Sequence, residues 1–180
     1  MPAFFTLSRY CQRRFNDATA LHLLSLICER LGQHAYGADL AERSIAILET
    51  AYEETEDPEV EMRYTIANCT LGRLRLSLGQ FEGAGTSFER AHGLLADKEL
   101  QSRQIIVLKV QVHLGLGLAN FFLGDVEASL RFLEEGLQIA SANNYDGPLR
   151  SHLVILLAQV LWAIGTEGAK EEAKSRLLEW

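Results

Sequence analysis

The chain has 180 residues, of which 48% are hydrophobic and 23% are charged, and its formal net charge is −7. This composition supports a folded core and is too apolar for a disordered chain. The negative charge argues against non-specific nucleic-acid binding through a basic surface. Three cysteines without CxxC spacing favour buried thiols in a reducing compartment, and no run of 18 apolar residues predicts a membrane span.

The first sixteen residues contain three arginines and no acidic residue: Arg9, Arg13 and Arg14. A mitochondrial presequence has a similar composition. The aromatic side chains in this stretch favour a packed helix instead, with Phe5, Tyr10 and Phe15 directed inward. We therefore expect residues 1–16 to be a helix of a preceding repeat.

Four glycines recur along the rest of the chain at intervals of 47, 45 and 41 residues: Gly32, Gly79, Gly124 and Gly165. Each ends an apolar run of helical spacing and is followed by a second amphipathic segment. A near-constant period of this size indicates a solenoid of helical hairpins. We expect one repeat domain over residues 1–180, with hairpins at 17–54, 58–96, 98–142 and 148–179.

The hairpins are separated by helix-start signals. Asp57 followed by Pro58 combines an N-cap residue with proline at the first helical position. Asp97 marks the next junction, and Asp146 with Gly147 and Pro148 marks the last. The β-prone stretch at residues 105–108 lies inside a longer helical pattern, so no strand is predicted.

The second hairpin resembles the tetratricopeptide repeat (TPR) family nearly position for position. The matching residues are Leu71, Gly72, Gly79, Phe81, Ala84, Phe88 and Ala91. The third hairpin continues the register with Leu116, Gly117 and Gly124, whereas the first is a looser match and the fourth is shifted by one residue. The resemblance implies an all-α, TPR-like right-handed α-solenoid of about four hairpins, with repeats longer than usual.

Little in the chain indicates chemistry. The glycines of the sequence LGLGL at residues 114–118 follow no predicted strand, so they are interpreted as helix-packing glycines and not as a nucleotide loop. The five histidines have no metal-ligand spacing. We expect no catalytic residue, metal or cofactor, and therefore no enzyme.

The TPR resemblance implies a concave groove lined by the first helix of each hairpin, where partner segments bind. Its transferred positions are His22, Leu26, Glu29, Arg30, Cys69, Arg73, Leu76, Leu114, Leu118, Phe121, Phe122, Ile155, Gln159 and Trp162. These residues lack the Lys and Asn clamp that holds chaperone tails. The aromatic and aliphatic lining of the last two hairpins favours an apolar or helical partner, and burial of these side chains against each other is the alternative.

Two stretches resemble, more narrowly, the TPR scaffold subunit of the superkiller (Ski) complex. They are Val112–Gly136 and Leu153–Glu179, with the segment AQVLWAIG at residues 158–165 the most specific. The resemblance covers only a fraction of that large scaffold. It implies a cytoplasmic protein that holds an RNA helicase and WD-repeat subunits and assists exosome-mediated 3′-to-5′ mRNA decay.

Two further expectations remain open at this point. A stand-alone TPR adaptor for a short helical or apolar peptide is the alternative function, and the sequence does not decide whether RNA contacts the chain. The exposed ends of a solenoid, including the C-terminal Leu177, Leu178, Glu179 and Trp180, predict self-association.

Overall fold

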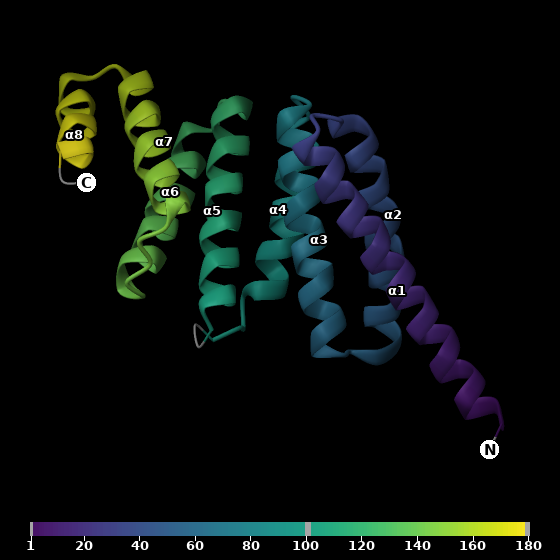
Figure 1. Ribbon diagram of the computed structural model, residues 1–180. Coiled ribbons are helices and arrows are strands. Elements are labelled where there is room, and N and C mark those ends of the chain that lie inside the picture. Colours follow the sequence, from purple (N-terminus) through teal and green to yellow (C-terminus); the bar gives the residue numbers. More distant parts are fainter. Residues whose placement is uncertain (1, 100–101, 179–180) are drawn as a thin grey trace. The chain divides into compact units, whose positions relative to one another are not determined.

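The computed structural model describes the backbone of residues 2–99 and 102–178, and side chains from residue 14 onward (Figure 1). Within these residues the chain forms helices and no strand, which confirms the predicted all-α class. The helices are α1 (Pro2–Arg30), α2 (His34–Thr55), α3 (Pro58–Ser77), α4 (Phe81–Leu95), α5 (Arg103–Leu123), α6 (Val126–Ala142), α7 (Pro148–Ile164) and α8 (Glu167–Leu178). Glu179 and Trp180, part of the predicted C-terminal end, lie outside the described residues.

The chain, expected as one domain, divides into two compact units, Met1–Gln80 and Phe81–Trp180. In the first unit, α2 packs between α1 and α3, and α1 also contacts α3. In the second unit each of the helices α4 to α8 packs on the next, and α5 also contacts α7. First helices of successive pairs therefore lie side by side within a unit, as α1 and α3 do, and as α5 and α7 do.

The N-terminal segment differs from the expectation. Residues 2–16 do not form a separate helix of a preceding repeat, because α1 runs from Pro2 to Arg30 without interruption. No glycine or proline lies between Pro2 and Gly32, so nothing in the backbone stops the helix earlier.

The predicted helix starts are confirmed at two junctions and wrong at one. The side chain of Asp57 caps α3 by accepting a hydrogen bond from the Glu59 backbone N–H at 2.8 Å, with Pro58 in the first turn. Helix α7 begins at Pro148. Asp97 begins no helix, because Ser102 is the N-cap of α5 and its hydroxyl accepts from the Ile105 N–H. Either residue type can cap a helix, so residue type alone did not distinguish Asp97 from Ser102.

The four periodic glycines all take the left-handed backbone conformation. Their φ angles are +73° at Gly32, +72° at Gly79, +85° at Gly124 and +80° at Gly165. Each follows the end of a first helix and lets the chain reverse without the penalty that a Cβ would bring. These turns set the common register in which equivalent positions of α1, α3, α5 and α7 can be compared.

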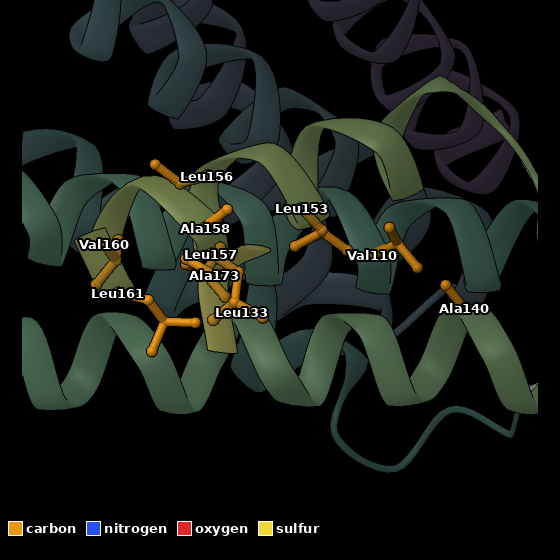
Figure 2. Close-up of a cluster of buried hydrophobic side chains, with 10 residues drawn as sticks. All are labelled: Val110, Leu133, Ala140, Leu153, Leu156, Leu157, Ala158, Val160, Leu161 and Ala173. Carbon is orange, nitrogen blue, oxygen red and sulfur yellow. The ribbon is translucent and has the colours of Figure 1, made fainter. Parts of the chain in front are cut away.

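The core of the second unit depends on two glycines in α5 that lie against large side chains. A Cβ at Gly115 would lie 2.4 Å from the ring of Phe88 on α4, and one at Gly117 would lie 2.5 Å from Leu133 on α6. Phe88 and Leu133 are fully buried. The interpretation of these glycines as packing residues is therefore confirmed. Leu133 continues into a cluster formed mainly by α7 (Figure 2).

The remaining repeat-defining residues lie as follows. Leu71 and Gly72 are buried on α3, and Ala84, Phe88 and Ala91 are buried on α4. Leu116 is buried on α5, and Phe81 is half-buried at the start of α4. Each buried position is apolar or small, as close helix packing requires.

By length and composition, α5 could cross a membrane, which differs from the expectation that no segment spans one. Four of its apolar residues, Val110, Val112, Leu116 and Ala119, are fully or almost fully buried in the second unit. The helix packs against α4, α6 and α7, so its apolar composition is that of a core helix surrounded by protein.

Replacing Gly117 tests this packing. The variant Gly117→Leu is expected to destabilise the chain by about 2 kcal/mol or more, because the new side chain overlaps buried Leu133. The matched control is Gly93→Ala on α4, where nothing lies within 4 Å of the added Cβ and a small gain of helix propensity is expected. Chemical denaturation followed by circular dichroism measures both. Equal stability of the Leu variant and the wild type would contradict the packing described.

Candidate protein-binding surface

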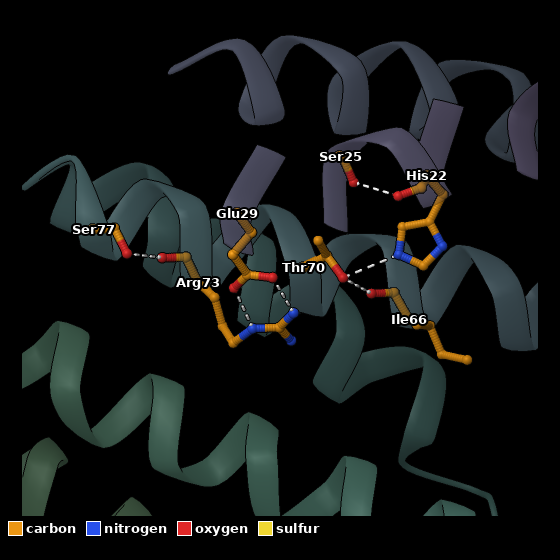
Figure 3. Close-up of polar contacts among 7 residues, drawn as sticks. All are labelled: His22, Ser25, Glu29, Ile66, Thr70, Arg73 and Ser77. Carbon is orange, nitrogen blue, oxygen red and sulfur yellow. Dashed lines mark hydrogen bonds and ion pairs between the residues drawn. The ribbon is translucent and has the colours of Figure 1, made fainter. Parts of the chain in front are cut away.

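The predicted groove positions of the first unit are joined to one another by polar contacts between α1 and α3 (Figure 3). Arg73 donates two hydrogen bonds to the carboxylate of Glu29, from Nε to Oε1 and from Nη2 to Oε2, each at 2.9 Å. Both side chains are partly buried. A bidentate pair of this kind holds both side chains in one geometry. The charge of Arg73 is thus matched inside the unit.

His22 makes a second link between the same two helices. Its Nε2 lies 3.1 Å from the hydroxyl of Thr70, and that hydroxyl donates to the carbonyl of Ile66 at 3.1 Å, so the ring nitrogen is the donor to Thr70. Burial lowers the pKa of His22, and the positive charges of Arg73 and Arg63 lower it further, while Glu29 raises it. The histidine therefore favours its neutral form and acts as a packing and hydrogen-bonding residue.

The other groove positions of the first unit are less available than predicted. Cys69 is buried, and this burial raises the pKa of its thiol to about 12, which makes it unreactive. Leu26 and Leu76 are half-buried, and Arg30 is exposed. Cys28 and Cys69 are both buried free thiols, as the cysteine pattern indicated.

In the second unit the groove positions differ sharply between α5 and α7. Leu114, Leu118 and Phe121 of α5 are half-buried and pack against the apolar cluster of α7. Their register equivalents on α7 are ten, six and three residues before Gly165: Ile155, Gln159 and Trp162. These three are exposed, Ile155 by 44% and Trp162 by 54%. We call them the α7 stripe.

The difference follows from the packing order of the first helices. The positions of α5 are covered because α7 lies beside it. Among the described residues no further first helix lies beside α7, so its equivalent positions stay in solvent. An exposed tryptophan and isoleucine at i and i+7 on one helix face form an apolar surface suited to a partner helix.

Phe122, the remaining predicted groove residue of α5, packs against α4. Its ring stacks on Phe81 of α4 with centroids 4.5 Å apart and planes 10° apart, although 54% of the residue remains exposed. Phe122 therefore belongs to the contact between α4 and α5. It does not extend the row of exposed residues that forms the α7 stripe.

A cluster of aromatic rings between α4, α5 and α6 was not predicted from the sequence. The ring of His113 is packed edge-on against His92 and Phe132, with centroid distances of 5.2 and 6.2 Å. Its Nδ1–H donates to the Lys109 carbonyl at 2.7 Å, and Nε2 lies 3.5 Å from the Glu135 carboxylate. Burial lowers the pKa of His113; the Lys109 hydrogen bond and Glu135 raise it, and His92 lowers it.

The described side chains do not meet the requirements of a metal site. Among the residues that the structure describes, no group of three or more His, Cys, Asp and Glu side chains could hold a metal ion. A cavity of about 450 Å³ in the first unit is lined by Phe15 and Arg63 among others. The guanidinium of Arg63 is engaged there by the Phe15 ring at 4.6 Å and by Glu59 at 2.9 Å.

Helices in consecutive antiparallel pairs, each closed by a left-handed glycine, define the chain as a TPR-like helical repeat protein. Solved structures share this fold. The nearly identical TPR-like repeats of a protein described as a kinesin light chain from Podosopora anserina give a TM-score of 0.65 at 19% identity, covering 90% of this chain and 74% of that one. BtubC from P. vanneervenii gives 0.58 at 15% identity, covering 96% and 72%.

The sequence is homologous to part of a larger protein. It is 30% identical over 178 residues to superkiller protein 3 of Saccharomyces cerevisiae and 30% identical over 177 residues to superkiller protein 3 of Schizosaccharomyces pombe. The matches cover 99% and 98% of this chain, but the chain spans only 12% of the length of either relative. No protein-family model matches the chain.

The buried histidine gives a pH-dependent stability. Because the pKa of His113 is lowered in the folded protein, the unfolded chain binds a proton that the folded chain does not, between the lowered pKa and the ordinary value of about 6.5. Stability is therefore complete above that value and falls as the pH decreases through this window.

We expect His113→Gln to flatten the pH dependence of the unfolding free energy between about pH 7 and pH 5. His152→Gln, which removes an exposed histidine of the same unit, is the control and should retain the wild-type slope. Denaturant unfolding at several pH values measures both, and parallel profiles for wild type and His113→Gln would contradict the assignment. A remaining slope in His113→Gln is expected from His22.

Proposed function

We propose that the chain is a non-catalytic protein-interaction scaffold that takes part in a cytoplasmic superkiller complex and assists exosome-mediated mRNA decay. One observation carries this proposal: the similarity to superkiller protein 3 extends over 99% of the chain. A similarity of this extent is that of a whole run of repeats and not of one generic TPR motif. The partners would be the RNA helicase and WD-repeat subunits of the complex.

The surfaces favour protein over RNA as the main ligand. The formal net charge of −7 opposes a general attraction to phosphate. Of the N-terminal arginines Arg9, Arg13 and Arg14, only the side chain of Arg14 lies in the described part, and it lines the cavity of the first unit. The exposed apolar side chains of the α7 stripe instead match the anchors that dominate protein interfaces.

Affinity capture tests the scaffold role. The full chain, used as bait in cytoplasmic extract, is expected to recover the helicase and WD-repeat subunits, identified by mass spectrometry. A complex reconstituted from these purified subunits should give the same result. Absence of both subunits from a well-folded bait, together with no binding of the purified subunits, would overturn this function.

A second function is favoured by the α7 stripe itself. The chain would then be a stand-alone adaptor that binds an apolar or helical segment along Ile155, Gln159 and Trp162, much as α7 lies along Leu114, Leu118 and Phe121 of α5. Such a segment would present apolar side chains at helical spacing.

The variant Trp162→Ala distinguishes this surface from the rest of the molecule. Loss of a large aromatic anchor is expected to weaken binding of a partner, or of an amphipathic helical peptide derived from it, by about 30-fold. Tyr36→Ala is the matched control, because this aromatic residue of the first unit is 58% exposed. Fluorescence anisotropy measures both affinities. Equal loss in the two variants, or none in Trp162→Ala, would exclude the α7 stripe as the site.

A further inference from the structure

The second unit contains a cavity that the proposed function does not use. It has a volume of about 310 Å³, and residues of α4, α5 and α6 line it. Ligand cavities in proteins have volumes of roughly 300–1,000 Å³, so this one is suited to a small ligand. What it can bind depends on which of its lining side chains are apolar and which carry charge or hydrogen-bond donors.

The deepest lining residues of the cavity are apolar. Leu95 of α4 is 2% exposed, and Val112 of α5 is fully buried. Ile139 of α6 adds a half-buried aliphatic side chain. These side chains offer no hydrogen bond, and a polar group that is buried without a partner is costly. The part of a ligand that reaches them must therefore be apolar.

Two basic side chains line the same cavity closer to the surface. Lys109 of α5 and His92 of α4 are both half-buried. The ammonium group of Lys109 has no ion-pair partner among the described side chains, and the contacts of His92 there are with the rings of His113 and Phe132. The described lining includes no carboxylate. Lys109 and His92 therefore supply donors for a negatively charged group.

His113 belongs to the lining as a ring that the chain itself holds in place. Its Nδ1–H donates to the Lys109 carbonyl at 2.7 Å, and its Nε2 lies 3.5 Å from the carboxylate of Glu135. Because burial lowers the pKa of His113, the ring is neutral at pH 7. A titratable group with a shifted pKa in a cleft is typical of binding sites. The permanent positive charge available to a ligand comes from Lys109.

The larger cavity of the first unit differs in its charge. Its Arg63 is already engaged by Glu59 and by the Phe15 ring, and the carboxylates of Glu54 and Asp57 line the same space. Positive and negative groups offset one another there, so neither sign of ligand charge is favoured. In the cavity of the second unit, the charge and the apolar lining together favour one class of ligand.

We propose that the cavity of the second unit binds a small aliphatic carboxylate. The hydrocarbon chain lies against Leu95, Val112 and Ile139, and burying it there is favourable. The carboxylate accepts hydrogen bonds from the ammonium group of Lys109 and from a ring N–H of His92. This inference does not depend on the proposed function, which rests on the similarity to superkiller protein 3 and on the α7 stripe.

Calorimetric titration of the full chain at pH 7 with hexanoate tests the proposal. Hexanoate is expected to bind saturably at one site. Hexanamide has the same hydrocarbon chain but no charge, and it should bind at least about tenfold more weakly because the charge-assisted hydrogen bond to lysine is lost. Inorganic phosphate should also bind more weakly, because it buries no hydrocarbon. Absence of saturable hexanoate binding, or equal affinities for the acid and the amide, would overturn the proposal.

Two substitutions locate the carboxylate. Lys109→Met keeps an unbranched side chain and removes the charge, and His92→Phe keeps an aromatic ring and removes its nitrogens. Each should weaken hexanoate binding at least about tenfold. Lys170→Met is the matched control, because it removes another half-buried lysine of the second unit, and it should keep the wild-type affinity. Circular dichroism verifies that each variant is folded. Unchanged affinity in Lys109→Met, or an equal loss in Lys170→Met, would contradict the site.

Histidine ring resonances in nuclear magnetic resonance spectra give a measurement on the unmodified chain. Hexanoate should shift the ring resonances of His92, which the His92→Phe variant assigns. The resonances of the exposed His152, on α7 of the same unit, should stay unchanged. Saturable binding that leaves the His92 resonances unshifted would place the ligand elsewhere and overturn the proposal.

Discussion

The close approach of helices at glycine is the constraint on which the rest of this structure depends. Gly115 and Gly117 of α5 admit Phe88 and Leu133 so closely that no Cβ fits between them. These contacts fix how far apart α4, α5 and α6 lie and which residues of each face inward. Because protein interiors are close-packed, this spacing limits the size of the neighbouring side chains.

A shared register makes the surfaces of the chain comparable. The left-handed glycines end α1, α3, α5 and α7 at equivalent points. Residues at the same distance in sequence from these glycines can therefore be compared between the four helices. In the second unit, Leu114, Leu118 and Phe121 of α5 are covered by the apolar cluster of α7, whereas the equivalent residues of the α7 stripe are exposed.

Polar groups link the first helices of the first unit to one another. The bidentate pair of Arg73 with Glu29 and the contact of His22 with Thr70 join α1 to α3, and both involve residues that a TPR groove would present to a ligand. The Nδ1–H of His113 similarly donates a hydrogen bond to the backbone carbonyl of Lys109. Chemical groups that resemble ligand-binding residues in the sequence are thus used to hold helices together.

The sequence by itself determined the helical class, the turn glycines, the helix starts at Asp57 and Pro148, and the packing role of Gly115 and Gly117. These features are local, or repeat with a period that a single chain displays: a left-handed turn needs glycine, and a cap needs its side chain at one position. The tertiary structure alone decided that α1 is one helix, that Ser102 and not Asp97 begins α5, that Arg73 is paired with Glu29, and which groove positions are covered. The reason is that residue type alone does not show whether a neighbouring helix covers a position: Phe121 and Trp162 are equivalent aromatic residues, yet Phe121 is half-buried against the cluster of α7 and Trp162 is 54% exposed.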